Sequence, residues 1–192
     1  MNTSIKTTPQ ERKLGFRVLF LGMFAIGTGQ TLFIAVLPPY ARGLGLSEVQ
    51  VGFIFSLSAL GWMLMSPFWG KRSEYLGRKS IIIRGLIIYS ITTILMGVEF
   101  RLNELGVINL STLFGLLILT RGCYGFLGSG AHSASMAYVA DRTTERERSG
   151  VMAVMGSAFA ISGIVGPGLA SAAVLLGPLV PYFLFGGITG FI

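Results

Sequence analysis

The sequence predicts an all-α protein that spans a membrane, and its composition and apolar segments support this prediction. Of the 192 residues, 52% are hydrophobic and 12% are charged, whereas roughly 25% of the residues in a soluble protein are charged. Several uncharged stretches also reach about 20 residues, the length that a helix needs to cross a hydrocarbon core of about 30 Å. The composition therefore excludes a soluble domain.

Five complete spans and part of a sixth are predicted from the apolar runs. The complete spans are expected at residues 14–38, 49–69, 81–98, 110–140 and 151–176. The first run is too long for the core of a signal peptide. After a break at Gly177 and Pro178, only 12 residues remain from Pro181 to Ile192, which is about 18 Å of helix. We therefore expect a tail at residues 1–13, a transmembrane bundle at 14–192, and a C-terminal half that this chain lacks.

The basic residues predict the direction in which the chain crosses the membrane. If alternate connections lie on opposite sides, 12 of the 15 Lys and Arg residues fall on the side of the N-terminus, two on the other side, and Arg121 within a span. The positive-inside rule then places the N-terminal tail in the cytoplasm. Short connections are typical of a bacterial inner membrane protein. Because the basic residues lie between apolar runs, the net charge of +7 does not predict nucleic-acid binding.

No pattern in the sequence predicts an enzyme, a metal centre or a cofactor site. The sequence contains no P-loop, nucleophile elbow, metal-ligand cluster or paired catalytic carboxylates. Its single cysteine, Cys123, cannot form a disulfide within the chain and is expected to be a small packing residue. The outer connections are too short for the soluble module that a receptor needs. Transport is therefore the function class that remains.

Arg121 lies deep within an apolar run. An arginine at the centre of a helix in lipid costs about 2.5–3.5 kcal/mol, so Arg121 is expected to face a cavity or a partner. The alternative is that its side chain reaches the outer interface. At 100° per residue, the small and polar residues of this span share one face, which predicts a wall next to water. These residues are Arg121, Gly125, Gly128, His132 and Ser135.

Two further polar residues within the spans have two interpretations each. His132, the single histidine, either makes a structural hydrogen bond or takes part in proton transfer or substrate binding, because histidine titrates near neutral pH. Gln30 either contacts a neutral substrate or forms a hydrogen bond between helices. If protons drive transport, the candidate carriers are His132, Glu74 with its partners, Glu99, and a group in the absent half.

The connection between the second and third spans, residues 70–79, is rich in charge and glycine. Gly70 and Gly77 permit a tight reversal with positive φ, and Glu74 can pair with an arginine. A positively charged anchor is the other interpretation. The segment resembles the loop signature of the major facilitator superfamily, Gly-x-x-x-Asp-x-x-Gly-Arg-Lys, which ends here at Arg78 and Lys79. Glu74 stands in place of the Asp.

This resemblance covers most of the chain and implies both a fold and a charge cluster. The fold is the N-terminal six-helix bundle of a twelve-helix transporter, built from two inverted three-helix repeats, with a substrate cavity facing the absent half. In the family, the acid of this loop, the arginine that follows it and an acid at the inner end of the fourth helix lock one conformation. The matching residues here are Glu74, Arg78 and Asp141.

Two further motifs resemble signatures of the same superfamily. Residues 121–125 are similar to the fourth-helix signature Arg-x-x-Gln-Gly, with Tyr124 in place of Gln, and in the family this arginine is associated with proton coupling. The fifth span is similar to the antiporter signature Gly-x-x-x-Gly-Pro-x-x-Gly-Gly. Its glycines and proline permit a bend and a close helix contact, and close packing alone is the other interpretation. They are Gly156, Gly163, Gly166 and Pro167.

The resemblance implies a secondary active transporter that exports a small amphipathic molecule, such as a drug or a metabolite, by proton-coupled alternating access. The implied partners are that small molecule, protons, the lipid bilayer and the C-terminal half. Uptake by symport or by facilitated diffusion is the nearest alternative. A transport-inactive membrane scaffold is the third.

Overall fold

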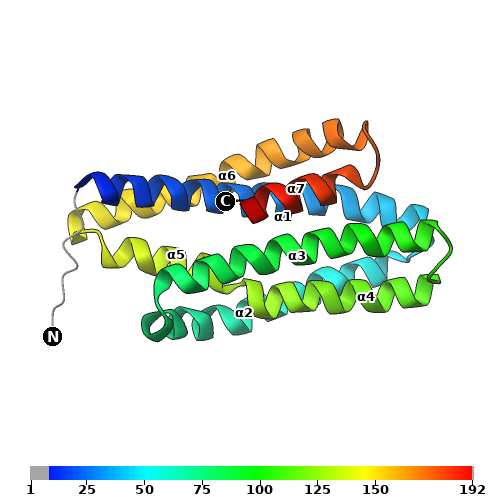
Figure 1. Ribbon diagram of the computed structural model, residues 1–192, viewed down its shortest axis with the longest axis horizontal. Helices are drawn as coiled ribbons and strands as arrows, with labels where there is room; N and C mark the ends of the chain where they lie inside the picture. Colours follow the sequence, from blue (N-terminus) through cyan, green and yellow to red (C-terminus); the bar gives the residue numbers. More distant parts are fainter. Residues whose placement is uncertain (1–8, 192) are drawn as a thin grey trace.

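The computed structural model describes residues 9–191, and every regular element in this range is helical (Figure 1). In chain order the elements are α1 (Pro9–Gly43), α2 (Glu48–Leu76), α3 (Arg78–Glu104), α4 (Leu110–Cys123), the π-helical turn η1 (Tyr124–Gly128), α5 (Gly130–Asp141), α6 (Glu145–Val174) and α7 (Val180–Phe191). Residues 1–8 of the predicted tail lie outside the described residues, and residues 9–13 already belong to α1. The predicted all-α class is confirmed within the described range.

Five helical stretches are long and apolar enough to cross a membrane, as predicted. They are Gln10–Gly43, Glu48–Leu76, Arg78–Glu104, Leu110–Asp141 and Glu145–Val174. Each is longer than its predicted apolar run, because the helix continues into polar residues and a search for apolar runs stops before them. The fourth stretch combines α4, η1 and α5. The predicted partial span corresponds to α7, which has 12 residues.

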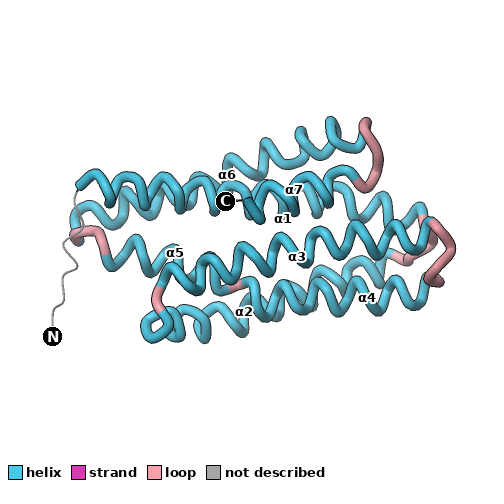
Figure 2. The backbone as a smooth tube through the Cα atoms, in the orientation of Figure 1, coloured by secondary structure: helices cyan, strands magenta, loops and turns pink. Residues whose placement is uncertain are grey.

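Successive membrane-length helices run in opposite directions within a single bundle (Figure 2), so that α1 and α6 run in the same direction. Helix α1 packs along α6, α3 packs along α5 and α7, and α2 packs along α4, η1 and α5. The start of α1, the α2–α3 junction and the α5–α6 link meet at one end, which we call the N-terminal end (Figure 1). The other three links lie at the opposite end. Polar connections are thereby kept away from the middle of the bundle.

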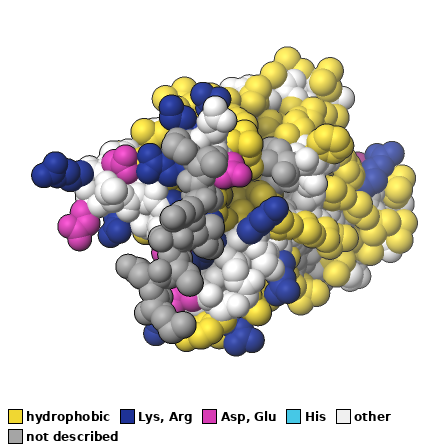
Figure 3. Space-filling view, turned by 60° about the vertical axis from the view of Figure 1, so that its left-hand side comes forward, with side chains coloured by type: hydrophobic (Ala, Val, Ile, Leu, Met, Phe, Trp, Pro, Cys, Tyr) yellow, Lys and Arg dark blue, Asp and Glu magenta, His cyan; other side chains and the backbone are white. Residues whose placement is uncertain are grey.

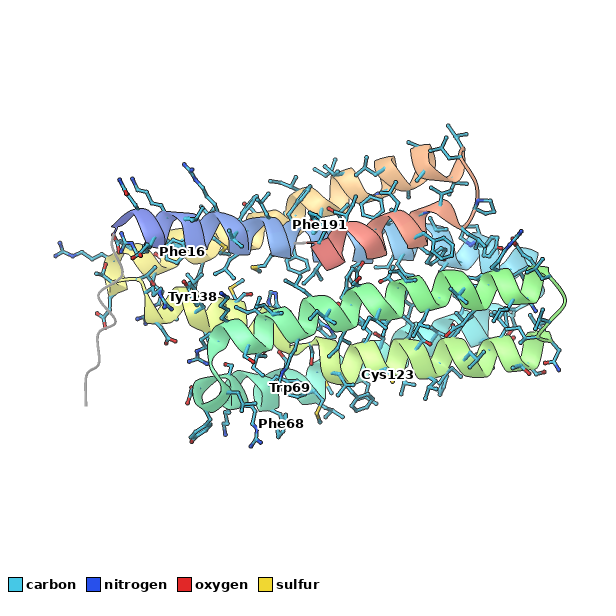
Figure 4. The ribbon with its side chains drawn as sticks, in the orientation of Figure 1. Phe16, Phe68, Trp69, Cys123, Tyr138 and Phe191 are labelled. Atoms are coloured by element: carbon cyan, nitrogen blue, oxygen red, sulfur yellow. The ribbon has the colours of Figure 1, made fainter. Side chains whose placement is uncertain are left out.

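The sides of the bundle are apolar and its N-terminal end is charged. Lys and Arg side chains gather around the N-terminal end, next to flanks covered by hydrophobic side chains (Figure 3). Exposed large residues on these flanks include Ile87, Leu119 and Ile164, as contact with lipid tails requires. Cys123 also lies on the outside of the bundle (Figure 4). The prediction that Cys123 is a packing residue is therefore wrong for this bundle.

Local capping residues set several helix ends. Ser47 and Gln50 form a capping box at the start of α2, which satisfies backbone donors that have no partner within the helix. Gly77 is the single residue between α2 and α3, and its φ of 87° is in the left-handed region that favours glycine. Gly70 lies inside α2. The prediction that both glycines form the reversal is therefore wrong for Gly70.

Candidate functional site

Arg121 lies within the bundle and faces α1. Its side chain is buried, with a residue exposure of 5%, and it follows the start of α4 by eleven residues, about 16 Å of helix. Its Nη2 donates a hydrogen bond of 3.0 Å to Oε1 of Gln30, and its Cζ lies 4.0 Å from the ring centroid of Phe33. The side chain therefore points toward a partner helix and not toward the outer end.

Gln30 and Tyr124 complete the surroundings of this guanidinium group. Nε2 of Gln30 donates to the Tyr124 hydroxyl at 2.8 Å, and the Tyr124 ring centroid lies 5.0 Å from Cζ of Arg121. The guanidinium is thus held by one hydrogen bond and by two aromatic faces, an arrangement that stabilises a buried cation without a carboxylate. Gln30 forms the interhelical hydrogen bond that was one of its two interpretations.

Arg121 and Gln30 also line an open cavity of about 760 Å³ between α1 and α2. Aromatic side chains from α2 and α6 form part of its wall, namely Phe55, Trp62 and Phe159. Hydroxyl groups of Thr31, Ser58 and Ser66 supply the neutral polar part. Among these lining residues Arg121 carries the one charge, so the wall combines apolar surface with a single positive group. Pockets of this kind suit small molecules that are partly apolar.

The predicted common face of the fourth span is divided by the π-helical turn. A π turn adds one residue to the helical register, so the 100° rule does not extend from α4 to α5. A Cβ on Gly125 would lie 2.5 Å from the Ser58 carbonyl oxygen of α2, and one on Gly128 would lie 2.7 Å from the Tyr124 ring. These two glycines serve close packing. The prediction that they share a water-facing wall with Arg121 is wrong.

His132 lies behind the aromatic wall of the cavity. Its ring centroid is 5.5 Å from that of Trp62 and 5.3 Å from that of Phe159. Its Nδ1 is buried and has no hydrogen-bond partner among the described residues. Ser135, one turn further, lines a separate groove between α1 and α3. A role for His132 in substrate contact would therefore require movement of Trp62 or Phe159.

The glycines predicted in the fifth span have different surroundings on α6. A Cβ on Gly166 would lie 2.9 Å from the Thr28 carbonyl oxygen and 1.9 Å from the Thr31 hydroxyl of α1. Thr31 also donates a hydrogen bond of 2.7 Å to the Ser162 carbonyl, so α1 and α6 meet closely here. Gly156 and Gly163 have nothing within 4 Å of such a Cβ, and Pro167 is exposed. Gly166 alone of this set serves the α1–α6 contact.

The predicted charge cluster is assembled at the N-terminal end. Nε of Arg78 lies 2.9 Å from Oδ2 of Asp141 at the end of α5, and its Nη2 lies 3.5 Å from Oε1 of Glu74. Arg78 also donates to the Gly70 carbonyl at 3.0 Å and to the Ser73 hydroxyl. One arginine thus connects the end of α2, the start of α3 and the end of α5. Lys79 is exposed beside it.

Sequence reasoning did not identify Ser73 or Trp62. Ser73 is 1% exposed, and a buried serine within a charged segment gives no sequence signal of its own. Trp62 lies on α2, and no polar periodicity in that helix marks the side chains that face the cavity.

These features define a bundle of membrane-length apolar helices with a partly polar cavity between α1 and α2 and an ionic cluster at one end. The sequence profile of the Major Facilitator Superfamily matches residues 19–192. The chain therefore belongs to this superfamily, and the predicted family and bundle fold are confirmed.

Proteins with names related to drug resistance are similar to this chain. Multidrug resistance protein 2 of Bacillus subtilis (strain 168) is 29% identical over 184 residues, which cover 96% of this chain and 43% of that protein. Quinolone resistance protein NorA of Staphylococcus aureus is 28% identical over 177 residues, which cover 91% of this chain and 42% of NorA. The chain thus spans less than half the length of these curated relatives.

Proposed function

We propose that this chain forms the N-terminal half of a transporter that exports small amphipathic molecules from the cell. The cavity beside Arg121 carries this proposal, because it joins aromatic walls to one positive group and to neutral hydroxyls. The names of the two relatives, which refer to multidrug and quinolone resistance, favour a drug-like substrate. A C-terminal half packed over the open side of the cavity would enclose that substrate.

The cavity composition favours molecules with an aromatic part and a hydrogen-bond acceptor. Phe55, Trp62 and Phe159 offer apolar and stacking surface, and Arg121 offers donors. The Nε of Arg121 is buried without a hydrogen-bond partner among the described residues, so an acceptor on the substrate or on the second half would satisfy it. Such a site binds neutral or acidic amphipathic compounds more readily than cations, unless the second half adds carboxylates.

We further propose that export is driven by protons and proceeds by alternating access. The hydrogen bonds from Arg121 to Gln30 and from Gln30 to Tyr124 join α1 to the fourth span. A proton or a substrate that enters the cavity changes the field at Arg121 and with it the α1–α4 contact. The exposed glycines Gly156 and Gly163 leave one face of α6 open for close contact with the second half.

The charge cluster would act as a latch on one conformation. Arg78 connects α3 to Asp141 on α5, and these groups are partly exposed. Partly exposed ion pairs contribute about 0–1 kcal/mol, which is enough to bias an equilibrium between two states and too little to prevent its reversal. The excess of basic residues at this end favours a cytoplasmic location, and a latch there would close the inner side of the transporter.

Flux measurements on the complete protein in proteoliposomes test the proposal. A pH gradient should drive accumulation of a fluorescent amphipathic compound, and reversal of the gradient should reverse the flux. Flux in the same direction as the proton gradient would replace export with symport. Flux that does not depend on the pH gradient would indicate facilitated diffusion. If no compound in a panel of neutral, acidic and cationic amphiphiles moves, the chain belongs to a transport-inactive scaffold.

A further inference from the structure

Glu99 is a buried acid on α3 that lies apart from the cavity. It precedes the end of α3 by five residues and is 7% exposed. The Thr120 hydroxyl on α4 donates a hydrogen bond to its Oε1. Its Oε2 is buried and has no hydrogen-bond partner in the described part of the chain. Among the described residues, this carboxyl group therefore accepts a single hydrogen bond, and the donor is a neutral hydroxyl.

No charged or titratable side chain forms an ion pair or a hydrogen bond with Glu99 in the described part of the chain. On α3, Arg101 pairs with Glu104 at 2.9 Å toward the exposed end, and Tyr40 of α1 donates to the same Glu104. On α4, Arg121 follows Thr120, but its guanidinium bonds to Gln30 and covers the Phe33 ring. On α7, the Tyr182 ring packs against Phe100, and its buried hydroxyl has no hydrogen-bond partner among the described residues. No ion pair among the described residues includes Glu99.

A carboxylate in this position would be a buried charge without a cation. Burial of an isolated ionised carboxylate is very costly, and such groups bind a proton instead. Burial of the neutral carboxylic acid costs far less free energy than burial of the carboxylate. The Thr120 hydroxyl donates a hydrogen bond to one of its oxygens. The α3–α4 interface around Glu99 is thus suited to a carboxylic acid and unsuited to a carboxylate.

We propose that Glu99 is a proton-binding site within the membrane, occupied by a proton when α3 and α4 are packed as they are here. Loss of that proton would require water or a cation at the interface, and hence separation of α4 from α3. Because Thr120 is followed directly by Arg121, such a movement would also displace the guanidinium at the cavity. The proposal concerns binding of a proton and does not depend on the direction or the existence of transport.

Infrared spectroscopy of the complete protein in lipid tests this site at neutral pH. The wild type should show the carbonyl stretching band of a protonated carboxyl group, and Glu99→Gln should abolish that band. Glu104→Gln is the matched control, because Glu104 is an exposed, ion-paired acid on the same helix, and it should leave the band unchanged. A spectrum of Glu99→Gln with the same protonated-carboxyl bands as the wild type would overturn the proposal.

A second variant keeps Glu99 in place and changes its hydrogen bond. Thr120→Val removes the hydroxyl that donates to Oε1 with little change in volume. The band assigned to Glu99 should then move to higher frequency, because a carbonyl without a hydrogen bond vibrates faster. A band that stays in place would show that the protonated acid lies elsewhere and would also overturn the proposal. Failure of the flux experiment would leave both infrared results unaffected.

Discussion

At the scale of single residues, the Arg121 cation is buried because protein groups take the place of its hydration shell. Gln30 supplies one acceptor, and Phe33 and Tyr124 supply aromatic faces. A flat guanidinium fits this arrangement, whereas the ammonium of lysine is a compact and strongly hydrated charge. The surroundings thus specify arginine and not merely a positive charge.

Arg121→Ala is expected to abolish proton-driven flux, and Arg121→Lys to reduce it at least about tenfold. A hydrogen bond to a charged group contributes roughly 1.5–3 kcal/mol, which corresponds to factors of about ten to one hundred. Flux in proteoliposomes is the measurement, with membrane insertion checked by fractionation. Arg101→Ala, at the exposed end of α3, is the control and should retain the wild-type rate. Full coupling in Arg121→Ala would remove this residue from the mechanism.

Asp141→Asn should slow the transport cycle more than Glu74→Gln does. Asp141 joins α5 to Arg78 at 2.9 Å, whereas Glu74 is a near neighbour in sequence at 3.5 Å, so its loss leaves the α3–α5 connection intact. Removal of a bias of about 1 kcal/mol changes a two-state ratio about fivefold. The turnover rate measures the speed of the transport cycle, and the apparent KM reports substrate affinity separately. A change confined to KM in either variant would contradict the latch.

At the scale of elements, the contact between α1 and α6 depends on the absence of one side chain. Gly166 lies against the Thr28 carbonyl and the Thr31 hydroxyl. The Thr31 side chain can rotate away from an added methyl group, but the Thr28 backbone cannot move without shifting α1. Packing of this kind is the means by which helices associate in lipid, where no hydrophobic force acts between them.

Gly166→Ala should therefore destabilise the bundle by about 1–3 kcal/mol, the usual cost of overpacking. Gly115→Ala on α4 is the control, since a Cβ there meets nothing within 4 Å. Thermal unfolding in detergent measures the difference. Equal melting temperatures for the two variants would show that α1 and α6 are not held as closely as described.

At the scale of the whole molecule, the sequence predicted the parts of the fold that the membrane dictates. A segment that crosses a lipid bilayer must be a long helix with few charges. The spans and the partial sixth helix could therefore be located from apolar runs. The π turn could not be predicted, because the sequence of residues 124–128 contains nothing that distinguishes a π turn from an α-helix. That single insertion moved Gly125 and Gly128 off the expected face. Likewise, spacing alone could not separate the packed Gly166 from the open Gly156 and Gly163.

The sidedness of the bundle is a prediction for the complete protein in intact cells. With Cys123 replaced by Ser, a cysteine at Val107 in the α3–α4 link should react with a membrane-impermeant thiol reagent. A cysteine at Arg146, at the N-terminal end, should react after permeabilisation only. Both positions are exposed, so access to the aqueous side decides the outcome. The reverse pattern would place the N-terminus outside the cytoplasm.

The junction at Gly77 has a mechanical consequence. Since one residue separates α2 from α3, a rotation of either helix about its own axis passes to the other through the backbone of Gly77 alone. The link between α3 and α4 has five residues, 105–109, and can absorb such torsion. The hairpin of α2 and α3 should thus turn as one lever, with its pivot beside Arg78 at the N-terminal end.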